Sequence, residues 1–119
     1  MSLGNFRNGS VVRLPLHIIQ DGGIPITDAQ DVFVRKVILP NGKVDGNFPV
    51  IMKLADPMFA IYYVDYKPSA VGNYIVIYSF VVDSITYSSI DTFNIYNSAE
   101  SSSGLAGGFA RPIIISRII

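Results

Sequence analysis

The chain is divided into short runs of β-branched and aromatic residues, and each run is ended by residues that favour turns. Runs of this composition favour strands over helices. We therefore expect six strands, at Ser10–Ile19, Gln30–Leu39, Phe48–Leu54, Phe59–Tyr66, Asn73–Val82 and Thr86–Tyr96. Six short strands in fewer than ninety residues favour an antiparallel all-β sandwich or barrel over βαβ units, which need longer crossover connections.

The composition excludes several classes of function. Nine Lys and Arg balance nine Asp and Glu, so the positive charge typical of a nucleic-acid binder is missing and we expect no nucleic-acid partner. With no Cys and a single His, the chain offers little for metal or acid–base chemistry, and we expect neither an enzyme nor a cofactor. No segment approaches the ~18 apolar residues of a spanning helix or has the pattern of a signal peptide, so we expect no membrane partner.

The segment Lys67–Tyr74 connects two of the expected strands and contains Pro68 and Gly72. A Pro-containing crossover that ends in Gly-x-Tyr resembles the corner of an immunoglobulin-like sandwich, in which the Tyr hydroxyl bonds back to the crossover backbone. The resemblance implies that Tyr74, Pro68 and Gly72 are corner and packing residues. Because the chain has neither a Cys pair nor Trp, an antibody-type domain is excluded, and the alternative is that Tyr74 is a half-buried strand residue.

Six short elements follow one another over residues 10–96. They are Gly9–Leu14, Asp21–Ala29, Leu39–Lys43, Tyr62–Pro68, Gly72–Tyr74 and Asp91–Ile95. Their order resembles an immunoglobulin-like module of tailed-bacteriophage virion structural proteins. The resemblance implies an immunoglobulin-like antiparallel β-sandwich over residues 1–96 and a structural role in the virion, after assembly in the host cytoplasm. It implies no catalytic residues, and bacterial surface proteins use the same modules.

Two expected strands that follow each other in the chain, Phe59–Tyr66 and Asn73–Val82, are apolar on both faces. A half-exposed strand should alternate apolar and polar residues, and two such strands side by side would expose a large apolar patch. We therefore expect a partner to cover one face. The residues predicted to form that interface are Phe59, Ile61, Tyr63, Ile75, Ile77 and Val81. The alternative is a sheet covered by the chain's own termini.

The last 23 residues, 97–119, differ in composition from the rest. Residues 98–108 are mostly Ser, Gly and Ala, which is typical of a linker, and an Ile-rich run follows Pro112. We expect an extended C-terminal assembly arm that adds to a sheet edge, on a neighbouring copy or else within its own domain. The arm residues predicted to form contacts are Phe109, Ile113, Ile114, Ile115, Ile118 and Ile119.

Three other features carry weaker signals. His17 is interpreted as structural, because there is no second His or catalytic arrangement around it. Asp21, Asp28 and Asp31 are interpreted as turn formers rather than as a calcium site. The seven Tyr are interpreted as packing residues rather than as a sugar-binding face.

The predicted function is that of a non-enzymatic virion structural protein: a capsid decoration, head–tail connector or tail component. Its expected partners are copies of itself and other virion proteins. The alternative is an adhesive or carbohydrate-binding module of a bacterial surface protein or tail fibre.

Overall fold

The computed structural model describes residues 2–97 and the backbone of residues 116–117. The strands are β1 (Ser2–Arg7), β2 (Val12–Gln20), β3 (Ile24–Pro25), β4 (Gln30–Ile38), β5 (Val50–Ile51), β6 (Lys53–Asp56), β7 (Ile61–Tyr66), β8 (Gly72–Val82), β9 (Ile85–Tyr96) and β10 (Ser116–Arg117). The described part contains no helix, and therefore none that could cross a membrane. The expectation of an all-β fold is confirmed.

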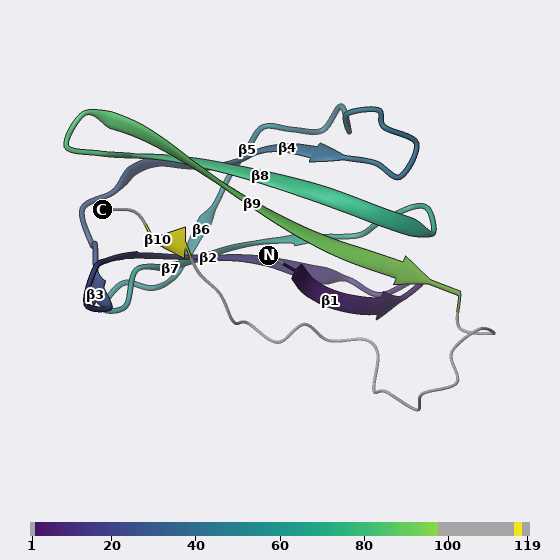
Figure 1. Ribbon diagram of the computed structural model, residues 1–119, viewed down its shortest axis with the longest axis horizontal. Coiled ribbons are helices and arrows are strands. Elements are labelled where there is room, and N and C mark those ends of the chain that lie inside the picture. The colour runs from purple at the N-terminus through teal and green to yellow at the C-terminus, as the bar shows by residue number, and fades with distance from the viewer. Residues whose placement is uncertain (1, 98–115, 118–119) are drawn as a thin grey trace.

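The strands form two sheets that face each other as a β-sandwich (Figure 1). One sheet, called here the β8 sheet, has the order β1-β9-β8-β4-β5. The other, called the β2 sheet, has the order β10-β2-β7-β6, and β3 pairs with β2. The β8–β9 hairpin is the longest unit and pairs in continuous register from Gly72 opposite Ile95 to Val82 opposite Ile85.

Five of the six expected strands match single observed strands to within two residues at each end. The expected strand Phe48–Leu54 is wrong as a single element. Its first part, β5, pairs with β4 in the β8 sheet, and its second part, β6, pairs with β7 in the β2 sheet. Met52 lies at the change of sheet, where its side chain is buried and its amide donates to the Val32 carbonyl at 2.9 Å.

Strand β1 is not among the expected strands, because its sequence contains Gly4 and Asn5 and does not alternate. Tertiary contacts hold it: Phe6 is buried and meets the ring of Phe93 edge to face at 6.3 Å. It pairs with β9 in the parallel direction, and β10 pairs with β2 in the parallel direction as well. The expectation of a fully antiparallel sandwich is therefore wrong at one edge of each sheet, where the edge strand is parallel to its neighbour.

The core between the sheets is rich in aromatic rings at one end. Tyr74 and Phe93 are register partners on β8 and β9, and their rings stack with centroids 4.8 Å apart. Tyr66, from the opposite sheet, meets both rings edge to face at 6.1 and 6.3 Å. Its hydroxyl donates to the Asp45 carboxylate at 2.8 Å, so this cluster also ties the loop after β4 to the sandwich.

Candidate interaction surface

The outer face of the β8 sheet, which points away from the sandwich core, carries apolar side chains among polar ones such as Ser79, Thr86 and Ser88. The apolar side chains share this face by register across β8, β9, β4, β5 and the segment after β4. They are Phe33, Ile38, Val44, Ile51, Ile75, Ile77, Val81 and Ile90, and together they are called here the apolar outer face. Ile90 is 54% exposed, Ile51 65% and Ile75 37%, so described residues leave much of this surface in contact with water.

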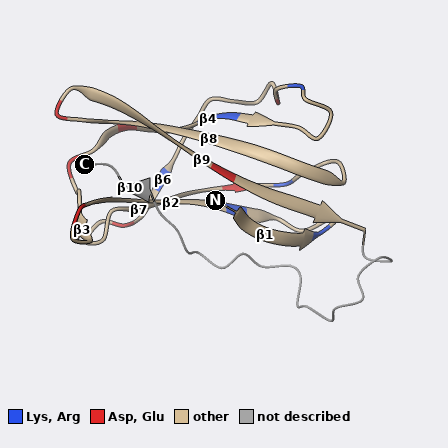
Figure 2. Ribbon diagram, in the orientation of Figure 1, with Lys and Arg blue, Asp and Glu red and all other residues tan. Residues whose placement is uncertain are grey.

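One charged side chain lies within this face, because Lys36 of β4 is exposed and is the register partner of Ile77. In Figure 2 the ribbons of β8 and β9 carry few charged positions along their length. On β4, the Arg35 guanidinium donates to the Ser79 hydroxyl at 3.1 and 3.3 Å and lies over the Phe33 ring at 5.7 Å. Arg35 thereby covers the side chain of Ser79, which β8 directs outwards between Ile77 and Val81. A protein–protein interface taken as a whole also combines apolar and polar side chains.

The outer face of the β2 sheet is built differently. The register partners Arg13 and Asp65 form a bidentate ion pair at 2.8 and 3.1 Å, and the guanidinium lies 4.1 Å from the centroid of the Tyr63 ring. The hydrogen bond from Arg13 lowers the pKa of Asp65, and the same bond raises the pKa of Arg13. Both side chains are nearly half exposed, so this arrangement suits a surface in contact with water.

The residues predicted to form one interface fall into two groups. Ile75, Ile77 and Val81 belong to the apolar outer face on β8. Ile61 and Tyr63 lie half-buried on β7, in the opposite sheet. Phe59 lies half exposed in the turn before β7. The idea that the two strands lie side by side is wrong, because the chain changes sheets between them at the Lys67–Val71 crossover.

Five members of the apolar outer face were not predicted from the sequence. They are Phe33, Ile38, Val44, Ile51 and Ile90. Ile90 could have been found, since the expected strand Thr86–Tyr96 places it on the face opposite Phe93 and Ile95. Ile51 could not have been found in this way, because its face depends on the change of sheet at Met52.

The corner predicted from the sequence is present. The Tyr74 hydroxyl donates to the Ala70 carbonyl at 2.7 Å and accepts from the Ala70 amide at 3.0 Å, so its predicted bond to the crossover backbone is confirmed. Pro68 is buried beside it. Gly72 has φ +130°, and a Cβ atom there would lie 2.7 Å from Cβ of Pro40. These three residues hold the crossover in place, which is a structural role.

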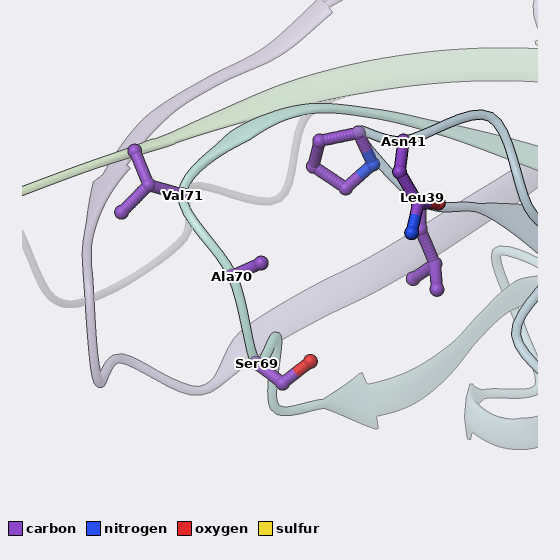
Figure 3. A pocket seen from close by; sticks show the side chains of 6 residues that line it. Leu39, Asn41, Ser69, Ala70 and Val71 are labelled. Atoms are coloured by element: carbon purple, nitrogen blue, oxygen red, sulfur yellow. The ribbon is translucent and has the colours of Figure 1, made fainter.

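A shallow pocket of about 420 Å³ lies between the turn after β4 and this crossover (Figure 3). It is lined by Leu39, Pro40, Asn41, Ser69, Ala70 and Val71. None of these side chains is ionisable, so the pocket has no group that could act as a general acid or base.

Asp91 is the buried acidic side chain of the core. It projects from β9 towards the inside of the sandwich, next to the diagonally placed Tyr78 of β8. Burial raises the pKa of Asp91 above its usual range. Burial, together with the neighbouring carboxyl group, raises the pKa of Tyr78 well above its usual value. Neither residue lines the pocket between the turn after β4 and the crossover.

The remaining sequence interpretations concern metals and the arm. Among residues 2–97 no group of three or more His, Asp or Glu side chains is placed to hold a metal ion, and this includes Asp21, Asp28 and Asp31. His17 lies on the outer side of β2, with Nε2 buried and without a hydrogen-bond partner in the described part of the chain. The predicted arm residues Phe109, Ile113, Ile114, Ile115, Ile118 and Ile119 lie outside the described residues.

No family model, curated protein or solved structure matches this chain. The candidate surface is therefore defined by its geometry alone.

Proposed function

We propose that the chain is a non-enzymatic structural subunit of a tailed-phage virion, and that it acts through contacts with other subunits. In this proposal the sandwich is a rigid immunoglobulin-like block. Its apolar outer face makes lateral contacts with a neighbour, as a capsid decoration, head–tail connector or tail component would.

The strand order supports the immunoglobulin-like part of the proposal. Immunoglobulin-type sandwiches place strands B, E and D next to one another in one sheet and C, F and G in the other. The order β2-β7-β6 corresponds to the first set, and β4-β8-β9 corresponds to the second. The Tyr74 corner at the start of β8 lies where such a fold places it, at the beginning of strand F.

The exposure of the apolar outer face supports the proposed role in assembly. Burying one Ile side chain contributes about 1.5–3 kcal/mol, so Ile51, Ile75 and Ile90 left in water represent a substantial driving force for association. Ile77 and Ile90 are register partners with Ile75 two residues away, and monomeric proteins rarely expose large contiguous apolar patches. A formal net charge of zero also means that copies of the chain do not repel one another strongly.

The adhesive alternative has less support. A sugar-binding face would need exposed aromatic side chains, but four of the seven Tyr are buried and the other three are only partly exposed. One of these three partly exposed rings, Tyr63, is covered on one side by Arg13.

Sedimentation velocity over a range of concentrations tests the assembly role. We expect the full chain to associate as its concentration rises and the Ile90→Asp variant to remain monomeric. Met58→Asp is the matched control, because Met58 is 71% exposed in the turn between β6 and β7, away from the apolar outer face. Association that persists in Ile90→Asp, or is lost equally in Met58→Asp, contradicts the proposed surface.

The virion role has its own test. We expect genes for capsid or tail proteins beside the gene for this chain, and the chain itself in purified phage particles by mass spectrometry. Neighbouring genes for cell-wall or surface adhesion would favour the alternative function instead.

A further inference from the structure

The edge of β2 that faces away from β7 is a docking site for an extended segment. The Ile18 amide donates to the Ala60 carbonyl at 3.2 Å and its carbonyl accepts from Ile26 at 2.9 Å, so the backbone of Ile18 faces β7 and β3. Backbone direction alternates along a strand, so Arg13, Pro15, His17 and Ile19 direct their backbone groups to the opposite edge. Pro15 fits there because an edge position needs no amide donor.

Strand β10 occupies one end of this edge. Ser116 pairs with Ile18 and Arg117 with Ile19, in the parallel direction. The remainder of the edge, from Arg13 to His17, has no strand partner among the described residues. Among the described residues, the pairing covers two positions of the nine-residue strand β2.

The connection that brings β10 to this edge is longer than the distance requires. The Asn8 amide donates to the Tyr96 carbonyl at 2.8 Å, so β9 ends close to the start of β2. From Val12 to Ile19 is about 23 Å, which roughly seven extended residues can span. The nineteen residues 97–115 are available. Fully extended they would span roughly 60 Å, enough to reach the same edge of a neighbouring copy.

We propose that β10 exchanges between copies of this chain: in the assembled protein, Ser116–Arg117 of one copy pairs with Ile18–Ile19 of the next. The inference rests on the proposed assembly role and names its second contact. Pairing within one copy and pairing between copies make the same hydrogen bonds. The length of the connection between β9 and β10 therefore decides which of the two pairings forms. A connection of nineteen rather than seven residues lowers the effective concentration of β10 at its own edge roughly fourfold, and neighbours held by the apolar outer face supply competing edges.

Disulfide capture tests the exchange directly, because the natural chain contains no Cys. The Ile19→Cys/Arg117→Cys variant places two thiols at register partners. Oxidised at a concentration at which sedimentation shows association, it should form mostly covalent dimers and higher oligomers on non-reducing gels. The control is Val11→Cys/Arg117→Cys, in which the exposed Val11 lies outside the paired register and should give only background cross-linking.

A second measurement avoids any change in β2. A full chain carrying Arg117→Cys with a nitroxide label is mixed with ¹⁵N-labelled natural chain. Exchange should broaden the amide signals of His17–Gln20 in the ¹⁵N-labelled copies, and signals near Met58 should not change.

The outcomes separate the two proposals. A purely intramolecular disulfide and unbroadened His17–Gln20 signals, in a chain that does associate, overturn the exchange and leave the assembly role standing. A chain that remains monomeric at every concentration overturns both.

Discussion

The outer faces of the two sheets differ in how they meet solvent. On the β2 sheet the outward cross-strand pair near the start of β2 is Arg13 and Asp65, joined by two hydrogen bonds. On the β8 sheet the outward pair in the middle of the β8–β9 hairpin is Ile77 and Ile90, of which Ile90 is more than half exposed, and Lys36 lies on the other side of Ile77. The backbone is the same kind of paired strand in both cases. Under the proposed assembly role, a partner should therefore approach from the side of the β8 sheet.

Moving an ion pair onto the β8 sheet gives the largest expected effect. The variant Ile77→Arg/Ile90→Asp replaces the central apolar pair by charges at register positions, as on the other sheet. Removing two Ile side chains from an interface, each contributing about 1.5–3 kcal/mol, should weaken association at least about 100-fold. Sedimentation velocity measures this, and the charge-swapped control Arg13→Asp/Asp65→Arg should associate like the natural chain. Undiminished association would remove the functional distinction between the two faces.

The reverse exchange tests the β2 sheet. In an Ile90→Asp background, the substitutions Arg13→Ile/Asp65→Ile remove the ion pair and uncover the Tyr63 ring. The outer face of the β2 sheet then becomes more apolar. We expect concentration-dependent association to return, through the other side of the sandwich, because a contiguous exposed apolar patch drives association. A triple variant that remains monomeric in sedimentation would show that the ion pair does not keep this face free.

Substitution of the corner residue Tyr74 should lower the stability of the sandwich and leave both outer faces unchanged. Tyr74→Phe removes the hydroxyl that bonds to the Ala70 amide and carbonyl, and should lower the free energy of unfolding by about 1 kcal/mol. Urea unfolding measures this, with Tyr63→Phe as the control that should change little. Association should be unaffected, and an equal loss in both variants would argue against the corner bond as a source of stability.

Asp91→Asn tests the buried acid of the core. Burial raises the pKa of Asp91 in the folded chain, so the folded state binds this proton more tightly than the unfolded state does. The stability that this proton contributes is fully present below about pH 4 and is lost as pH rises through the raised pKa. Asp91→Asn should therefore be more stable than the natural chain at pH 7, by on the order of 1 kcal/mol, and similar to it near pH 4.

Urea unfolding between pH 4 and pH 7 measures that difference. Asp65→Asn is the control with the opposite sign, since the pKa of Asp65 is lowered and its smaller, solvent-exposed contribution is lost as pH falls. A stability difference for Asp91→Asn that does not change with pH would contradict the buried titration.

Much of the fold was predictable because local chemistry decides it. The strands around Val34, Leu16 and Val76 follow from β-branched runs, and the hairpin at Asp83–Ser84 follows from turn residues between two such runs. The Tyr74 corner was predictable since crossover, Gly and Tyr lie within eight residues. Strand β1 was not predictable, because Gly4 and Asn5 disfavour a strand, and its pairing with β9 and the contact between Phe6 and Phe93 are tertiary.

The candidate surface was predictable only in part. The sequence identified Ile75, Ile77 and Val81, because apolar residues on both faces of one strand cannot all enter a single core. It also identified Ile61 and Tyr63, which lie on the opposite side of the sandwich. The assignment of a residue to one outer face or the other needs the sheet order, which depends on pairings between residues far apart in the chain.

By itself, then, the sequence determined that this chain forms short strands, that it has more apolar surface than one two-layer core can bury, and that Tyr74 bonds to the crossover before it. These properties depend on residue type and on neighbours within about ten positions. Only the tertiary structure decided that the chain changes sheets at Met52 and in the crossover before β8, and that β10 reaches the edge of β2. Those outcomes depend on which strands compete for the same sheet edge. Backbone hydrogen bonds are the same for every residue, so the sequence does not show which strand wins that competition.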